Sequence, residues 1–365
     1  MAFTAQDVKN LREKTGVGMM ECKKALVEAD GDMEKAIEIL RERGLASSAK
    51  KSSRVAAEGL VVTAVDKANK ISAIVEINCE TDFVAGNPEF KDFCNAVAKT
   101  VLESKPADLE ALLASPISGG TMTVEETKQE LFLKVRENMN VRRFAVVEGI
   151  VADYIHMGGS VGVIVSFAAD DDTAAKAEFA EMGKNVAMQI AAMKPEYLSE
   201  ADISADELEK MRTITIESAL NKPESLPKPI LMNVFAKALP EFSEADAAAY
   251  EEQKSNKFLF NFLSKEAIAK LAEVAVASKD EIAANPIFGK VVDGRIAKQI
   301  KESCLLKQDF VRSDIFEGTV GAYIASVAKT LGASIECTGY TIYVRGEGIE
   351  KKESNFAEEI ASMIK

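Results

Sequence analysis

A change of hydrophobic period at Gly59, followed by an arrangement that occurs twice, constrains the fold of this chain more than any other feature. Before that residue, apolar side chains recur at helical spacing, whereas after it β-rich runs alternate with polar turns. In each repeat, two β-rich runs joined by a turn precede one amphipathic helix. The first repeat has runs at 60–65 and 71–79 and a helix at about 90–102. The second repeat has runs at 144–154 and 161–168 and a helix at about 173–193. A helix at about 319–331 and a strand at 335–344 are expected to complete the second half. The chain is therefore predicted to be an α+β protein with two related hairpin-plus-helix subdomains in its core.

The chain has 365 residues, which is more than one hydrophobic core usually accommodates, so two or three domains are expected. The pattern predicts, in order, a three-helix domain with a linker, two core subdomains, a region with two long helices inserted into the second of them, and a C-terminal helical module. The corresponding ranges are 1–54, 55–148, 149–203 together with 310–345, 204–309, and 346–365.

Apolar stripes and helix caps predict the three helices of the N-terminal domain. Thr4 begins a capping-box pattern, Asp32 is placed to cap the third helix, and Gly44 is a suitable left-handed end for that helix. The apolar stripe of the second helix includes Met20. After Gly44, residues 46–54 are expected to form a linker or a fraying extension of the third helix.

An apolar residue, Phe83, stands in a turn where polar residues are usual. Asn87 followed by Pro88 predicts the N-cap and first position of the next helix, because proline loses no hydrogen bond there. Residues 81–84 must then form a tight connection from strand to helix. In this connection Phe83 either packs beneath the turn or protrudes from it.

The region inserted into the second subdomain is expected to contain two long helices, at 205–220 and 290–306. Between them prolines interrupt the chain, and apolar residues are frequent enough for further helices with a small core of their own. Phe258, Phe260 and Phe262 alternate along one segment, and facing solvent they would form a patch typical of an interface. We expect an added helical core here, with a self-association surface as the alternative.

Composition argues against several classes of protein. The net charge of −13 disfavours nonspecific nucleic-acid binding, which requires clustered cations. No apolar run reaches about 18 residues and no signal-peptide pattern is present, so the chain is expected to be cytoplasmic and away from membranes. Five cysteines without CxxC spacing and a single histidine, His156, predict neither a zinc site nor a disulfide framework.

The residues themselves also disfavour an enzyme. A cysteine–histidine nucleophile would need His156 and a thiol in one cleft, whereas three of the five cysteines occupy apolar positions of predicted helices or strands. The glycine-rich segment 158–162 lacks the Gly-Lys-Ser/Thr ending of a phosphate-binding loop, and Gly346-Glu-Gly348 is too short for a dinucleotide fingerprint. We therefore expect no catalytic residue, no cofactor and no metal.

Four motifs resemble, in the same order along the chain, those of the elongation factor Ts family. They are Thr15-Gly-Val-Gly-Met-Met-Glu-Cys-Lys-Lys-Ala-Leu26, Thr81-Asp-Phe-Val84, Asn138-Met-Asn-Val-Arg-Arg143, and Gly346-Glu-Gly-Ile-Glu-Lys351 with Asn355-Phe-Ala-Glu-Glu-Ile-Ala361. Only the stretch from about 223 to 289 lacks a clear counterpart. The chain is accordingly identified as a member of that family.

The resemblance implies a guanine nucleotide exchange factor for the translational GTPase elongation factor Tu. It implies that Thr81, Asp82, Phe83 and Val84 displace magnesium in the partner and so promote release of GDP. It also implies that the N-terminal domain is a ubiquitin-associated-like docking module and that the two inserted helices form an antiparallel, coiled-coil-like hairpin. The docking residues that the resemblance assigns are Met19, Met20, Lys23, Lys24, His156, Asn355 and Phe356.

The implied partner is elongation factor Tu in its GDP-bound and nucleotide-free forms, with no direct nucleic acid and no membrane. A homodimer within a two-to-two complex is left open. Taken without the resemblance, Lys23 and Lys24 are by default a solvated helix face, and a lone histidine such as His156 is more often a satisfied surface or core residue than a functional one. The alternative function is a non-catalytic adaptor or scaffold that uses the three-helix domain and the helical hairpin.

Overall fold

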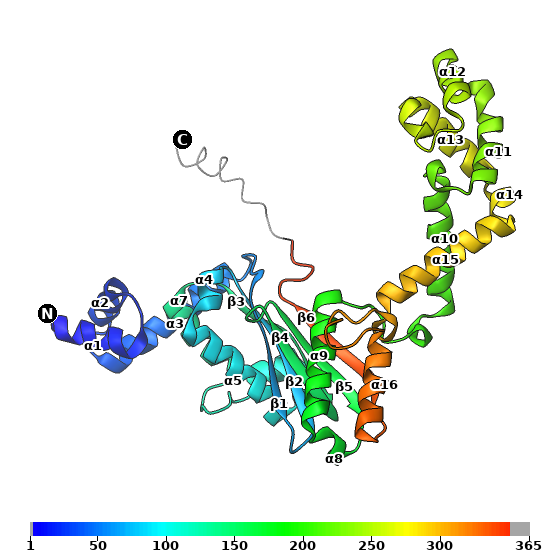
Figure 1. Ribbon diagram of the computed structural model, residues 1–365. Coiled ribbons are helices and arrows are strands. Elements are labelled where there is room, and N and C mark those ends of the chain that lie inside the picture. Colours follow the sequence, from blue (N-terminus) through cyan, green and yellow to red (C-terminus); the bar gives the residue numbers. More distant parts are fainter. Residues whose placement is uncertain (1–2, 351–365) are drawn as a thin grey trace, which may run out of the picture. The chain divides into compact units, whose positions relative to one another are not determined.

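The structure is a computed structural model that describes residues 3–350, apart from the side chains of residues 45, 46 and 48–50 (Figure 1). The chain forms two compact units. The first contains the chain as far as Lys194, then Phe310–Gly318 and the chain from Ala322, and the second contains Pro195–Asp309 with Thr319–Gly321. Among the described helices, none combines the length and the apolar character needed to cross a bilayer.

The first unit begins with helices α1 (Ala5–Thr15), α2 (Met19–Glu28) and α3 (Met33–Lys51). The predicted caps are confirmed, since Thr4 caps α1 and Asp32 caps α3 by accepting from backbone N–H groups of the first turn. The three helices share a small core with Leu133 of α7 (Val124–Val135). The prediction that Met20 joins the apolar stripe is wrong, because its side chain is 64% exposed.

The prediction that the third helix ends at Gly44 is also wrong, because α3 continues to Lys51. Gly44 is buried where α3 packs on α7. A Cβ atom at this position would lie 2.0 Å from the Cδ2 atom of Leu133, so the missing side chain allows the two helices to approach closely. The glycine therefore serves packing between helices and does not form a left-handed cap.

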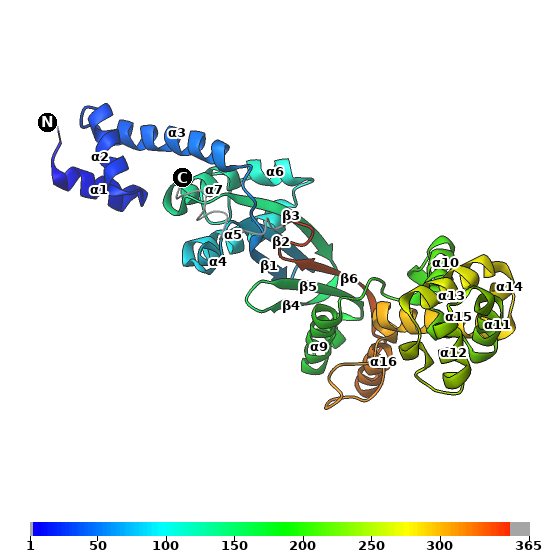
Figure 2. The same ribbon diagram turned by 90° about the horizontal axis from the view of Figure 1, so that it is seen from above.

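Two three-stranded antiparallel sheets form the core of the first unit (Figures 1 and 2). The strand order is β1 (Glu58–Asp66), β2 (Ile71–Cys79), β3 (Met139–Glu148) in one sheet and β4 (Ile150–His156), β5 (Val161–Ala168), β6 (Glu336–Val344) in the other. Helix α5 (Pro88–Ser104) packs on β1 and β2, and α9 (Ala177–Met193) packs on β4 and β5. The other faces of the two sheets meet around Val61, Ile74 and Ile164. Each sheet is thus covered by one long helix and packs against the other sheet, which confirms the predicted α+β core.

The shorter helices α4 (Asp82–Gly86), α6 (Leu109–Ala114), α8 (Asp171–Ala174) and α16 (Val320–Leu331) lie between these elements along the chain.

The run at 144–154, predicted as a single strand, is split between the two sheets. β3 ends at Glu148 and β4 begins at Ile150. Gly149 between them has a φ of 107°, a region that favours glycine, and its N–H donates to the carbonyl of Lys70 at 2.7 Å. The chain changes sheet at this residue, so the repeat consists of a hairpin, a helix and a third strand.

A fully buried carboxylate, that of Glu76, joins β2 to β3 and to the segment after β6. Its oxygens accept from the Gly346 N–H (2.8 Å), Asn78 Nδ2 (3.1 Å), Arg142 Nη1 (3.0 Å) and Arg143 Nε (2.6 Å). Burial alone would raise the pKa of Glu76, but these hydrogen bonds, led by that from Gly346, hold the pKa below its ordinary value. The charge is therefore retained inside the protein.

The second unit is helical. Its helices are α10 (Ala205–Leu220), α11 (Lys228–Ala238), α12 (Glu244–Gln253), α13 (Lys265–Ala277), α14 (Lys279–Ala283) and α15 (Pro286–Ser303), with 3-10 turns at Glu200–Asp202, Pro223–Ser225, Leu239–Glu241, Leu259–Phe262 and Leu305–Lys307. Helices α10 and α15 pack together as predicted for the helical hairpin, and Arg212 of α10 pairs with Asp293 of α15.

The predicted added core is confirmed within this second unit. Phe235 is completely buried, and its ring stacks on Tyr250 with centroids 4.6 Å apart and packs on Phe260 at 6.0 Å. Phe258 and Phe262 face outward and are 62% and 49% exposed. Of the three alternating phenylalanines, one therefore joins the core and two remain on the surface.

Replacing Glu76 with glutamine is expected to lower the free energy of unfolding by about 3 kcal/mol near neutral pH, because two arginines lose their shared carboxylate. The folded pKa lies below the ordinary value of 4.5, so this stabilisation is complete above pH 4.5 and is lost as the pH falls through the folded pKa. The difference in melting temperature between wild type and variant should therefore shrink as thermal unfolding is measured at progressively lower pH.

The matched control is Glu347→Gln, which removes a carboxylate that also pairs with Arg143, at 3.2 Å, but is 57% exposed. This change should cost less than about 1 kcal/mol. A melting-temperature difference for Glu76→Gln that stays constant at low pH would contradict the role given to its charge.

Candidate functional site

The Thr81–Val84 turn leads from β2 into the one-turn helix α4 and then into α5. The Thr81 side chain caps α4 by accepting from the Val84 N–H at 3.3 Å. Asn87 caps α5 and Pro88 occupies its first position, as predicted. Two successive caps therefore define the backbone of this connection.

Phe83 protrudes from the Thr81–Val84 turn, whereas Val84 points inward. The Phe83 side chain is 86% exposed and that of Val84 is 7% exposed. The structure thus decides between the two positions of Phe83 that the sequence leaves open. A large aromatic side chain held in water on a capped turn is a candidate anchor for a protein partner.

Polar contacts from distant segments support the turn. The Glu137 carboxylate accepts from both the N–H (3.0 Å) and the hydroxyl (2.8 Å) of Thr81. The Asn138 N–H donates to Glu80 at 2.6 Å, and the Asn138 side chain donates to the carbonyl of Arg54 at 2.9 Å. Sequence reasoning missed Glu137, because no local pattern connects it with a residue that lies 56 positions away.

The predicted docking residues of α2 lie on an exposed helix face. Met19 and Met20 are 41% and 64% exposed, and Lys23 and Lys24 are exposed beside them. Sequence reasoning missed Val27, which is 57% exposed and follows Met20 by two helical turns. Three apolar side chains and two cations are therefore interspersed on one exposed face of α2.

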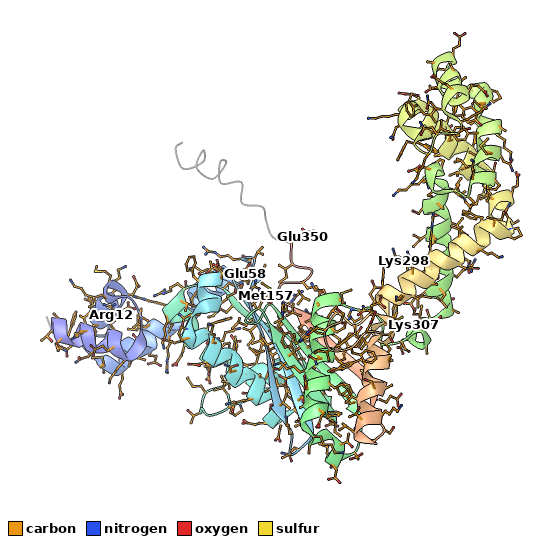
Figure 3. The ribbon with its side chains drawn as sticks, viewed as in Figure 1. Arg12, Glu58, Met157, Lys298, Lys307 and Glu350 are labelled. Atoms are coloured by element: carbon orange, nitrogen blue, oxygen red, sulfur yellow. The ribbon has the colours of Figure 1, made fainter. Side chains whose placement is uncertain are left out.

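His156 ends β4 next to the turn that contains Met157. Its Nδ1 atom lies 3.0 Å from the Tyr154 hydroxyl, and the ring is half-buried. Met157, which sequence reasoning missed, is 80% exposed at a φ of 44° (labelled in Figure 3). The exposed apolar group of this turn is therefore the methionine, whereas the histidine is half-buried with a polar partner.

The Thr81–Val84 turn and the Met157 turn lie at the same edge of the two sheets. Glu58, at the start of β1, is paired with the last residue of β2, from which the first turn departs. Three residues later, the Val61 N–H donates to the carbonyl of Gly159 in the second turn, at 2.8 Å. Figure 3 shows Glu58 and Met157 along this edge. The topology thus brings two exposed apolar side chains to one edge.

The segment that follows β6 begins at this edge as well. Arg345 pairs with Glu58 at 2.9 Å, and Gly346 is held by Glu76. The predicted docking residues Asn355 and Phe356, to which this segment leads, lie outside the described residues. The N-terminal face on α2 reaches the core through α3, which packs on both α2 and α7.

The described thiols do not resemble catalytic nucleophiles. All five cysteines are buried and free. Burial raises the pKa of Cys79 to about 12 and that of Cys337 to about 11, so neither is a thiolate at neutral pH. In residues 3–350, no group of three or more His, Cys, Asp or Glu side chains is placed to hold a metal ion. The geometry gives the cysteine–histidine hypothesis no support.

A hollow of about 450 Å³ lies at the other end of the β1–β2 hairpin. The turn between the two strands, the strand β4 and the helix α9 line it, and both lysines and aspartates occur among the lining residues. The length of β2, roughly 30 Å at the usual rise per residue, separates this hollow from Phe83. It is therefore not part of the site formed by the two turns.

Comparison with known proteins gives consistent matches. A family model described as elongation factor TS matches residues 80–246 and 260–347. The chain is 42% identical over 366 residues to elongation factor Ts of Clostridium perfringens (strain 13 / Type A), covering 99% of each. It is 40% identical over 369 residues to elongation factor Ts of Clostridium kluyveri (strain NBRC 12016), again covering 99% of each.

These matches correct the view that residues 223–289 lack a counterpart. The family model covers 223–246 and 260–289, and the clostridial relatives align along almost the whole chain. The region carries none of the four short motifs, which explains why they alone did not reveal the likeness.

Phe83→Ala is expected to change the free energy of unfolding by less than about 0.5 kcal/mol, because the side chain is 86% exposed. Phe90→Ala on α5 is the matched control, since Phe90 is completely buried and its truncation should cost about 3 to 5 kcal/mol. Urea unfolding of both variants measures the difference. A loss of stability in Phe83→Ala comparable to that in Phe90→Ala would mean that Phe83 packs in the core.

Proposed function

Because the chain belongs to the elongation factor Ts family and is a translation elongation factor, we propose that it binds elongation factor Tu carrying GDP and promotes release of the nucleotide. The observation that carries this proposal is the exposed Phe83 on a turn whose backbone is capped twice. GTP then rebinds to the emptied partner. The chain acts as an exchange factor and not as an enzyme, since no covalent bond is made or broken.

In the proposed mechanism, Asp82 and Phe83 enter the partner near its magnesium and phosphate site. Phe83 contributes apolar burial, and Asp82 contributes orientation and charge. Magnesium is bound largely through substrate phosphates and a few protein ligands, so loss of its coordination weakens the hold on the β-phosphate. Displacement of the ion therefore promotes release of the nucleotide without any bond being broken.

Exchange of this kind depends on differential binding. The factor drives release only if it binds the nucleotide-free partner more tightly than the GDP-bound partner. Linkage then requires GDP to weaken binding of the factor by the same ratio.

The remaining exposed groups supply docking area. The exposed face of α2 has an adaptable methionine surface beside Lys23 and Lys24, which suits a protein partner. Met157 and His156 form a second contact at the edge that carries Phe83. By region, we assign exchange to residues 55–148 and an accessory helical role to residues 204–309. Docking is assigned to residues 1–54, to residues 149–203 with 310–345, and to residues 346–365, which include Asn355 and Phe356.

We place the protein in the cytoplasm with elongation factor Tu as its partner, without direct binding to nucleic acid or membrane. A homodimer within a two-to-two complex belongs to the same proposal and draws on the outward-facing Phe258 and Phe262. The rival adaptor function requires that binding to elongation factor Tu be equally strong with and without GDP. A titration in both states separates the two functions.

Stopped-flow release of fluorescent GDP from elongation factor Tu should accelerate when this chain is added, and Phe83→Ala should reduce that acceleration by roughly one to two orders of magnitude. This range follows from about 1.5 to 3 kcal/mol for burying such a side chain. Ile214→Ala on α10 removes another exposed apolar side chain, which is 63% exposed, and should leave release unchanged. Absence of any acceleration by the wild-type chain would exclude the exchange function.

Deleting residues 223–289 and joining α10 to the remainder of α15 by a short turn should leave GDP release largely intact, because the proposed exchange residues lie outside this segment. The measurement is the same stopped-flow assay, with circular dichroism to establish that the core is folded. Loss of release in a folded deletion variant would show that the accessory region contacts the GTPase.

Sedimentation of the intact and deleted chains tests the dimer. A mass that falls to that of a monomer on deletion supports self-association through this region, and a monomeric intact chain excludes it.

A further inference from the structure

We propose that Glu137 is a positioning residue of the exchange site, which holds the Thr81–Val84 turn in the shape that presents Phe83. The inference rests on the proposed function and extends it to a residue outside the family's short motifs. Glu137 follows α7 and precedes β3, and it is 56 positions from the threonine that it binds. Three contacts join the two residues: Thr81 N–H to Oε2 at 3.0 Å, and the Thr81 hydroxyl to Oε1 at 2.8 Å and to Oε2 at 3.0 Å.

The direction of these hydrogen bonds determines what they do. An ionised carboxylate only accepts, so the single hydroxyl hydrogen of Thr81 points toward Glu137. The lone pairs of the same oxygen then remain available to the Val84 N–H, which donates to it at 3.3 Å. Glu137 thus orients the hydroxyl as the acceptor that caps α4. A neutral side chain that donated to this hydroxyl would compete with the cap.

The helix that Thr81 caps needs such support. α4 contains only five residues, Asp82–Gly86, and an isolated single turn is unstable in water. Apart from the cap, its first turn is closed by the Ala85 N–H, which donates to the carbonyl of Thr81 at 3.2 Å. Val84 and Ala85 are buried, but Phe83 has no comparable contact because it is 86% exposed. The direction of the Phe83 side chain therefore depends on the backbone at Thr81.

Glu137 is itself held on both sides. Arg136 ends α7 with a left-handed φ of 61°, and its N–H donates to the carbonyl of Phe132 at 2.8 Å. Asn138 is 4% exposed, and its N–H donates to Glu80 at 2.6 Å. Because both neighbours are fixed, the carboxylate reaches Thr81 from a rigid backbone, which is what a positioning residue requires.

The test compares Glu137→Gln with Glu148→Gln in the full-length chain. Glu148 ends the strand that Glu137 precedes, and its carboxylate is an exposed partner of Lys105 at 3.3 Å, so it is a matched control for loss of one charge. We expect Glu137→Gln to lower the maximal rate of GDP release about tenfold, as for loss of a charge-assisted hydrogen bond, and Glu148→Gln to leave it unchanged.

Two further measurements distinguish positioning of the turn by Glu137 from a general effect on stability. In a Phe83→Ala background, Glu137→Gln should change GDP release less than about twofold, because the side chain that it positions is gone. Hydrogen exchange should accelerate at the amides of Val84 and Ala85 in Glu137→Gln, with no change in the α5 amides. Additive effects of the two substitutions on release, or unchanged exchange at Val84 and Ala85, would overturn the proposal.

A second variant keeps the test valid where Glu137→Gln fails to fold. Thr81→Val removes the hydroxyl while keeping the shape, and it should reproduce the faster amide exchange at Val84 and Ala85 and the slower GDP release. If the wild-type chain does not accelerate GDP release, the exchange function fails. The hydrogen-exchange result then still decides whether Glu137 positions the turn.

Discussion

The arrangement of the first unit depends on one buried charge, the carboxylate of Glu76. Taking a carboxylate out of water is strongly unfavourable unless nearly all of its acceptor capacity is used. Here four donors come from three separate parts of the chain: β2 itself, the start of β3, and the turn after β6. A displacement of any one of these segments would leave a charge unsatisfied inside the protein. The contact therefore holds the β2–β3 sheet and the end of β6 in a single register, and it keeps the two exposed turns at the same edge.

That register matters because the exposed side chains at this edge have little to hold them individually. Phe83 and Met157 both project into water, and neither gains stability for the folded chain from its own burial. Their positions come from backbones that the sheets and caps have already fixed. A partner that covers them would not have to order these backbones on binding, so more of the apolar contact would contribute to affinity. The cost of ordering the turns is met during folding by Glu76, Glu137 and the successive caps.

Features set by nearby residues could be predicted from the sequence, and features set by distant ones could not. The caps at Thr4, Asp32 and Asn87 each require only a few consecutive residues, and the sequence predicts all three. In the sequence, Gly44 and Gly149 are both single glycines that a local pattern interprets as breaks. In the structure, Gly44 allows α3 to approach α7, whereas Gly149 allows the chain to change sheet. Only the three-dimensional neighbours distinguish these roles. The motif around Asp82 and Phe83 indicates a site, but the carboxylate that binds Thr81 in this turn, that of Glu137, belongs to no local pattern.

Glu76 and Glu137 show how burial separates two roles for the same side chain. Glu76 is inaccessible to solvent, so water does not compete with its donors for the carboxylate oxygens. Two of its four donors are guanidinium groups of β3, and its hydrogen bonds hold separate segments of the core together. Glu137 is only half-buried and binds a single residue, through one amide and one hydroxyl. Its contribution to global stability is correspondingly smaller, although its effect on the direction of one backbone turn is not. A residue of this second kind escapes a search for fully buried charges, and it is found by following the hydrogen bonds outward from the exposed side chain that they orient.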